Sequence, residues 1–181
     1  MFFSEQEKKE LLKISRQTLT EYLTHFVEPQ FETSSENLLK HYSCFVTLNE
    51  KKTNELRGCR GETSADRPLI KSVVKMSIAS AVDDPRFFPM VLDEVAEIKI
   101  KLNVLSEMRK ILVKDVVVGK HGLLIKKGYN AGLLLPQVPV HYNWNREMYL
   151  QQLCKKAGLP KDSWQSPDII LFGFETIEWG E

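Results

Sequence analysis

The chain has 181 residues, of which 43% are hydrophobic and 27% are charged, values typical of a globular protein with one domain. Its 25 Lys and Arg residues balance 24 Asp and Glu residues, which argues against nucleic acid as a partner, because nucleic-acid-binding domains are usually strongly basic. The sequence shows neither an apolar run of the ~18 residues that span a membrane nor the apolar core of a signal peptide. We therefore expect a cytoplasmic protein that has no membrane partner.

The cysteines bear on both compartment and chemistry. Cys44, Cys59 and Cys154 are widely spaced and odd in number. This usage fits a reducing compartment and argues against a disulfide framework. The spacing also differs from the Cys-x-x-Cys pairs of common zinc sites, so we expect no metal and no cofactor.

Residues 5–24 predict an amphipathic helix, because their apolar side chains recur at near-helical spacing. Ser4, with Glu7 three residues later, predicts a capping box at its start. Residues 27–42 are mostly polar and predict a loop.

A β-hairpin is expected next, with strands at residues 43–48 and 56–63 and a turn at 49–54. The register that we expect pairs Leu48 with Leu56, Phe45 with Cys59 and Cys44 with Arg60. Alternation of side chains would then place Arg57 and Cys59 on one face of the hairpin and Cys44 on the other.

Residues 69–82 predict a second helix, whose wide apolar stripe should be buried on one side. Pro68 suits its first turn, and Ser64 or Asp66 is expected to cap it. Residues 95–105 predict a strand with one buried and one wet face, since apolar residues there alternate with Lys and Asn.

Three further strands are expected, at residues 116–125, 131–135 and 169–179. Between the last two, an irregular segment should lead into a helix that Asn143 or Asn145 caps. Strands thus occur as hairpins with helices interspersed, so the predicted class is α+β with mainly antiparallel sheet.

Seven different short motifs are spread along nearly the whole chain: Phe45-Val46-Thr47-Leu48, Leu56-Arg57-Gly58-Cys59 with Gly61, Asp84-Pro85-Arg86-Phe87, Val104-Leu105-Ser106, His121-Gly122-Leu123, Gly132-Leu133-Leu134-Leu135-Pro136-Gln137-Val138 and Leu153-Cys154-Lys155-Lys156-Ala157-Gly158. With this ordered set, the chain resembles the AMMECR domain family, named after the human deletion syndrome of Alport features, midface hypoplasia and elliptocytosis. The hallmark of that family is Leu-Arg-Gly-Cys-Ile-Gly, and this chain has Arg60 in place of the isoleucine.

The resemblance implies a single domain over residues 1–181 with two lobes. The larger lobe is expected to hold both chain ends and an antiparallel sheet, and the smaller lobe, inserted into it, a second short sheet. The hallmark at residues 56–61 is expected at the cleft between the lobes. Microbial relatives look associated with Memo-like and radical-SAM proteins, which implies a shared pathway without naming a substrate.

Cys59 is the sharpest candidate for catalysis. The thiolate is the reactive form of cysteine, and a nearby cation such as Arg57 favours it. His121 or His141 would act as a base, although His141 stands where relatives look to carry an acid. In the plainer interpretation, Cys59 is a small buried residue beside a glycine. A mixed zinc site formed by Cys59, His121 and His141 is a further alternative.

The other candidates are expected to bind a ligand. They are Arg57, Gly58, Arg60, Gly61, Glu62, Arg86, Gln137 and His141. Glycine within a strand is tolerated where another backbone or a ligand approaches closely. For Arg86, the alternative is an ion pair with Asp84 that fixes a turn.

Two functions therefore stay open. The first is an enzyme whose cleft binds an anionic or amide-bearing substrate, with Cys59 as a nucleophilic or redox thiol and a histidine that moves protons. The second is a non-catalytic binding or scaffold domain that takes a protein segment or a metabolite in the cleft.

Overall fold

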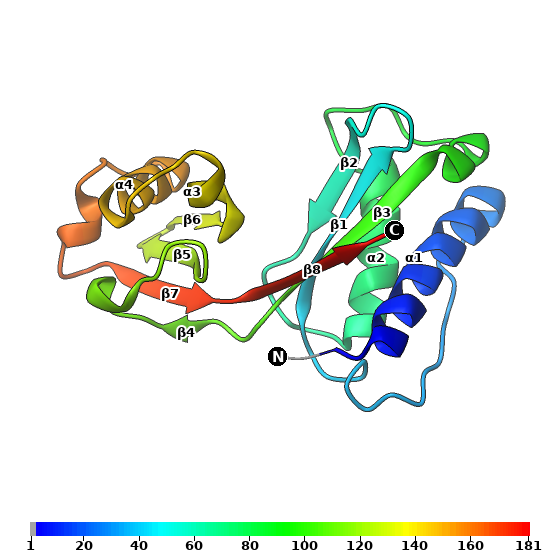
Figure 1. Cartoon of the computed structure of the whole chain (residues 1–181), viewed down its shortest axis with the longest axis horizontal. Helices are drawn as coiled ribbons and strands as arrows, with labels where there is room; N and C mark the ends of the chain where they lie inside the picture. The colour runs from blue at the N-terminus through cyan, green and yellow to red at the C-terminus, as the bar shows by residue number, and fades with distance from the viewer. Residues whose placement is uncertain (1–2) are drawn as a thin grey trace. The chain divides into compact units, whose positions relative to one another are not determined.

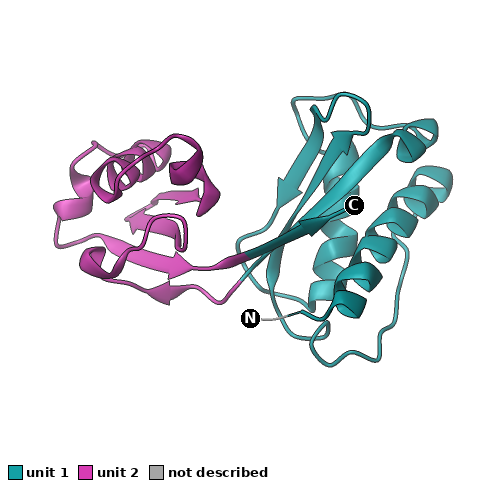
Figure 2. Ribbon diagram, in the orientation of Figure 1, with its two compact units in different colours: residues 1–105, 177–181 teal, residues 106–176 magenta. Residues whose placement is uncertain are grey.

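The computed structural model describes residues 3–181, and the chain folds as two compact units. Unit 1 comprises residues 1–105 and 177–181, and unit 2 comprises residues 106–176 (Figure 2). Each unit combines helices with an antiparallel sheet, which confirms the predicted α+β class. No helix within residues 3–181 has both the length and the apolarity needed to cross a membrane.

Unit 1 is built on a four-stranded sheet that has helices α1 and α2 on one face (Figure 1). Its elements, in chain order, are α1 (Glu5–His25), β1 (Ser43–Glu50), β2 (Leu56–Gly61), α2 (Leu69–Val82), the 3-10 helix η1 (Leu92–Glu97), β3 (Ile98–Leu105) and β8 (Thr176–Gly180). The strands lie in the order β2-β1-β3-β8, and β1 pairs antiparallel with both β2 and β3. The face that the helices cover forms the core of this unit.

Helix α1 begins as the sequence predicts. The Ser4 side chain accepts the Glu7 N–H at 3.2 Å, and the Glu7 carboxylate accepts the Ser4 N–H at 2.8 Å. This complete capping box satisfies backbone N–H groups that have no partner within the helix.

Helix α2 begins differently from the prediction. Its N-cap is Pro68, which makes no side-chain cap bond, so the expectation that Ser64 or Asp66 caps it was wrong. The N–H groups of Leu69 and Ile70 donate instead to the backbone carbonyl groups of Lys40 and Leu38, in the loop between α1 and β1, at 2.9 and 3.2 Å. These long-range bonds take the place of a local cap.

The register between β1 and β2 also differs from the prediction. Thr47, not Phe45, lies opposite Cys59. The other two expected pairings, Leu48 with Leu56 and Cys44 with Arg60, were wrong as well. Because the slip is by two residues, Cys59 and Cys44 still lie on opposite faces of the sheet, as predicted.

A bulge in β2 accounts for one residue of the slip, and the pairing of Leu56 with Asn49 instead of Leu48 accounts for the other. Asn49 pairs with Leu56 and Leu48 pairs with Gly58, which leaves Arg57 without a partner on β1. Such an extra residue interrupts the alternation of side chains. The argument that placed Arg57 on the same face as the thiol therefore does not hold across the bulge.

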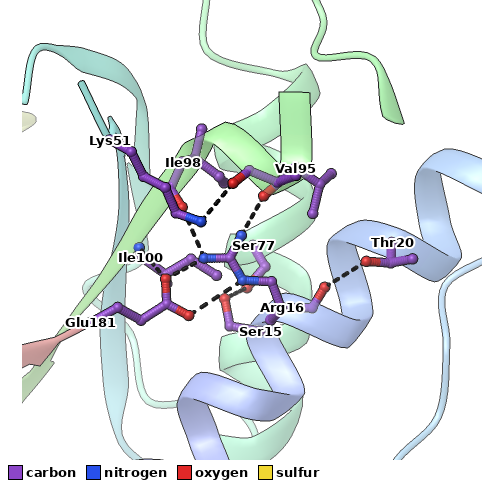
Figure 3. A network of polar contacts seen from close by, with 10 residues as sticks. Ser15, Arg16, Thr20, Lys51, Ser77, Val95, Ile98, Ile100 and Glu181 are labelled. Carbon is purple, nitrogen blue, oxygen red and sulfur yellow. Dashed lines mark hydrogen bonds and ion pairs between the residues drawn. The ribbon is translucent and has the colours of Figure 1, made fainter. Parts of the chain in front are cut away.

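Polar contacts around Arg16 tie α1 to the sheet (Figure 3). The guanidinium donates to the carbonyl groups of Val95 and Ile98 and to the carboxylate of Glu181. Glu181 also exchanges backbone and side-chain hydrogen bonds with Ile100, each of 3.1 Å. This network borders an open hollow of about 680 Å³, and because its groups are bonded to one another we assign it a structural role.

Unit 2 is a second four-stranded sheet covered by helix α4. Its elements are β4 (Arg109–Lys110), the 3-10 helix η2 (Val113–Asp115), β5 (Gly122–Lys127), β6 (Asn130–Leu134), α3 (Gln137–His141), α4 (Arg146–Lys156), the 3-10 helix η3 (Ser163–Gln165) and β7 (Ile170–Phe174). The strand order is β4-β7-β5-β6, and the core contains Leu123, Ile125, Tyr149, Leu153 and Leu171. Asn145 caps α4, one of the two caps that the sequence predicts.

Three expectations for unit 2 need correction. The strand expected at 116–125 starts only at Gly122, because the Val117 carbonyl accepts the N–H groups of Lys120 and His121 and forms a turn. The segment expected to be irregular after Pro136 forms the short helix α3. The strand expected at 169–179 is divided at Glu175 into β7 and β8, which belong to different sheets.

Candidate functional site

Cys59 lies on β2, the edge strand of the unit 1 sheet. Its side chain is half-buried, whereas Cys44 and Cys154 are buried. The Cys59 Sγ lies 3.3 Å from the Thr47 Oγ1, its partner across the strands. Burial raises the pKa of the Cys44 thiol far above its ordinary value and also raises the pKa of Cys154. Cys59 is thus the thiol best placed to react with a solute.

Asp84 holds the backbone of Cys59. Its Oδ2 accepts the Cys59 N–H at 2.8 Å, although the two residues are separated by helix α2. On an edge strand, alternate N–H groups point away from the sheet and need such a partner. The Asp84 side chain is 3% exposed, so this contact lies within the protein.

Arg86 pairs with the same carboxylate. Its Nε donates to Asp84 Oδ1 at 2.9 Å and its Nη2 to Oδ2 at 2.6 Å, which is the ion pair that the sequence offers as the alternative role of Arg86. These bonds hold the pKa of Asp84 well below its ordinary range. Asp84 in turn raises the pKa of Arg86, and a charged Cys59 acts in the same direction.

Arg57 is paired with Glu94 of η1. Its Nε and Nη2 donate to the two carboxylate oxygens at 2.7 and 3.1 Å, and Nη2 also donates to the Phe88 carbonyl at 3.1 Å. Burial alone would raise the pKa of Glu94, but the bonds from Arg57 and from a backbone N–H outweigh it and lower that pKa. The Nη1 of Arg57 is buried and has no acceptor among residues 3–181.

Phe87 connects the two arginines. The Cζ of Arg57 lies 5.9 Å and the Cζ of Arg86 lies 5.5 Å from the centre of its ring. A cation at this distance from an aromatic face is attracted by the ring quadrupole. The Phe87 ring thus contacts both guanidinium groups.

Packing within unit 1 accounts for both hallmark glycines. A Cβ atom at Gly58 would lie 2.1 Å from the carbonyl oxygen of Ser80 in α2, so only glycine allows the helix this close to the strand. A Cβ at Gly61 would lie 2.1 Å from the ring of Phe45, which packs over the glycine. The close approach that the sequence predicts is made by the protein's own groups.

Arg60 and Glu62 differ in how their side chains are used. The Arg60 side chain is exposed, and its N–H donates to the Ser80 hydroxyl at 2.9 Å. The Glu62 carboxylate accepts the Ser72 hydroxyl at 2.5 Å and pairs with Arg67 at 3.4 Å. Glu62 therefore connects the end of β2 to the start of α2.

The remaining candidates belong to unit 2. His121 accepts the Val117 N–H at its Nδ1, at 3.2 Å, so in the neutral ring the proton lies on Nε2. Gln137 and His141 are the exposed first and last residues of α3. The His141 ring packs edge-on against Tyr142, at 4.8 Å. The role predicted for each of them, and the predicted cleft, stay predictions.

Among the described residues, no group of three or more His, Cys, Asp and Glu side chains is arranged to hold a metal ion. Sequence reasoning missed the contacts of Thr47 and Glu94. Thr47 stands within a quoted motif, but its place opposite Cys59 depends on the register. Glu94 is 37 residues from Arg57, so no local pattern indicates their ion pair.

Known proteins are similar to this chain over nearly its whole length. The sequence profile of the AMMECR1 family matches residues 12–179. Protein MK0488 of Methanopyrus kandleri is 36% identical over 178 residues, which cover 94% of this chain and 86% of that protein. Protein TK0174 of Thermococcus kodakarensis is 39% identical over 175 residues, which cover 91% and 85%.

A solved structure shows the same fold. The crystal structure of the uncharacterized protein PH0010 from Pyrococcus horikoshii aligns with a TM-score of 0.85 and 35% identity. The alignment covers 95% of this chain and 90% of that one. These matches confirm the family resemblance that the sequence motifs indicate.

Proposed function

The chain belongs to the AMMECR1 family, and from this premise we propose that it is an enzyme that uses the Cys59 thiol as its nucleophile. The observation that carries the proposal is the difference among the cysteines. Cys59 is half-buried beside the Thr47 hydroxyl, and its N–H shares the Asp84 carboxylate with Arg86, while Cys44 and Cys154 are buried in the cores of their units.

In the proposed reaction, the sulfur of Cys59 forms a bond to an electrophilic carbon of the substrate, and a leaving group departs with the bonding electrons and a proton. Water then cleaves the covalent intermediate and restores the thiol. Thr47 orients the sulfur through its hydroxyl.

The proposal predicts selective alkylation of the folded protein at pH 7. We expect iodoacetamide to label Cys59 about tenfold faster than Cys44 or Cys154, because reactivity follows exposure and thiolate character. Mass spectrometry of the peptides gives the three rates, and unfolding in urea should make them similar. An activated Cys59 should also react at least as fast as free N-acetylcysteine.

Two outcomes would count against the nucleophile. One is slow and equal labelling of the three cysteines in the folded protein. The other is a Cys59 rate well below that of N-acetylcysteine, which is the behaviour of a partly shielded thiol without activation.

A binding or scaffold function without turnover is the second candidate. The side chains of Phe88 and Val91 are 91% and 61% exposed and follow Arg86 in the same loop, which favours contact with a protein segment or a metabolite. In that case Cys59→Ser should keep both binding and pathway function. A shared pathway with Memo-like and radical-SAM proteins stays a prediction from the family resemblance.

A further inference from the structure

Arg86 is held in one orientation by a carboxylate that also binds the backbone of Cys59. The Oδ2 atom of Asp84 accepts both the Cys59 N–H at 2.8 Å and the Arg86 Nη2 at 2.6 Å. The Oδ1 atom accepts the Arg86 Nε at 2.9 Å. The carboxylate therefore occupies the side-on edge of the guanidinium, which Nε and Nη2 form.

The other edge of this guanidinium has N–H donors without a hydrogen-bond acceptor. Within residues 3–181, the hydrogen bonds and the ion pair of Arg86 all go to Asp84 and leave Nη1 without an acceptor. The side chain is 55% exposed, so a solute can reach it. A planar guanidinium that is fixed through one edge loses little entropy when the other edge binds a carboxylate.

Arg57 is built in the same way but is a poorer place for an anion. Its side chain is only 13% exposed, and its unpaired Nη1 is buried. It also borders a hollow of about 360 Å³ that contains the carboxylates of Glu50, Asp93, Glu94 and Glu97. These carboxylates repel an anion, so of the two arginines that contact Phe87, Arg86 is the one that can bind it.

We propose that Arg86 binds a carboxylate group of the substrate on which Cys59 acts, an assignment that rests on the proposed function. Arg57 and Arg86 are each already paired with a carboxylate, so the two arginines and their partners carry no excess positive charge. A monoanion therefore meets less repulsion than a dianion. The substrate class is a small carboxylic acid rather than a phosphate monoester, which carries two negative charges near neutral pH.

The test is an NMR titration of the full ¹⁵N-labelled chain with sodium acetate, at an ionic strength kept constant with sodium chloride. The backbone amide signals of Cys59 and Phe87 should shift in a saturable way. Arg86→Lys should weaken acetate binding about tenfold, because lysine keeps the charge but has no planar edge. The matched control is Arg109→Lys, which alters another exposed arginine paired with a carboxylate two residues before it.

A second measurement needs no variant. In the unmodified chain, acetate should shift the side-chain Nε signal of Arg86 and leave that of Arg57 in place. Sulfate should bind more weakly than acetate. Equal acetate affinity in Arg86→Lys, an unshifted Arg86 signal, or tighter binding of sulfate would each overturn the assignment.

The two proposals can fail separately. Acetate binding does not need the sulfur, so Cys59→Ser should keep it. Acetate binding with unreactive Cys59 would refute the nucleophile alone, and a reactive Cys59 without acetate binding would refute the role of Arg86 alone.

Discussion

Replacing Gly58 with alanine should lower the free energy of unfolding by about 3 kcal/mol, the upper end of the usual cost of overpacking. The added Cβ would lie 2.1 Å from the Ser80 carbonyl oxygen. That oxygen belongs to the backbone of α2, so the whole helix would have to move away from β2. Urea unfolding of the two proteins measures the difference.

Two further variants of the same strand give stability changes with which the loss in Gly58→Ala can be compared. Gly61→Ala brings a Cβ against the Phe45 ring, which can rotate, so we expect a loss of about 1 kcal/mol. Arg60→Ala removes an exposed side chain from the same strand and should change stability by less than about 0.5 kcal/mol. If Gly58→Ala costs no more than Arg60→Ala, the close contact between α2 and β2 is not present in solution.

Replacing Asp84 with asparagine should lower the free energy of unfolding at pH 7 by about 2 kcal/mol, the usual value of charge-assisted hydrogen bonds. The substitution removes the negative charge that Arg86 pairs with at 2.6 Å. The neighbouring exposed residue gives the control, since Asp83→Asn should cost less than about 0.5 kcal/mol.

The loss of stability in Asp84→Asn should become smaller as the pH falls. The Arg86 side chain holds the pKa of Asp84 below the value of about 3.9 that it has in the unfolded chain. The folded state therefore gains from ionised Asp84 above that pH, and the gain is lost as pH falls toward the folded pKa. The difference in the free energy of unfolding between the unmodified chain and Asp84→Asn should be constant near neutral pH. It should become smaller below about pH 4. A difference that widens in acid would contradict the ion pair.

Local patterns were enough to predict most helices and strands. The capping box of Ser4 and Glu7 marks the start of α1, and it is fully formed. The apolar positions expected in the strand at 95–105 are buried from Ile98 to Val104. Asn103, on the face expected to be wet, is only 5% exposed and donates to Glu178 of β8. The pattern of one strand does not reveal which neighbour covers its polar face.

Contacts between distant segments were the part that the sequence could not provide. The pairing at Cys59 differs from the predicted register by two residues, of which the bulge at Arg57 accounts for one. Alternation within each strand is compatible with either register. Asp84 and Arg86 were recognised as a local turn, because they are close in the chain. The bond from Cys59 to Asp84 crosses 25 residues and depends on how α2 packs. The candidate cysteine was thus predictable, whereas its immediate partners were not.

The most direct test of the central claim asks whether the Cys59 sulfur is needed for function in the cell. Cells lacking their own copy of this gene would receive the unmodified chain, Cys59→Ser or Arg109→Lys at equal levels of folded protein. Their metabolite profiles would then be compared with those of the deletion strain. We expect Cys59→Ser to match the deletion strain and Arg109→Lys to match the unmodified chain. A Cys59→Ser profile identical to that of the unmodified chain would contradict the account and favour a binding function.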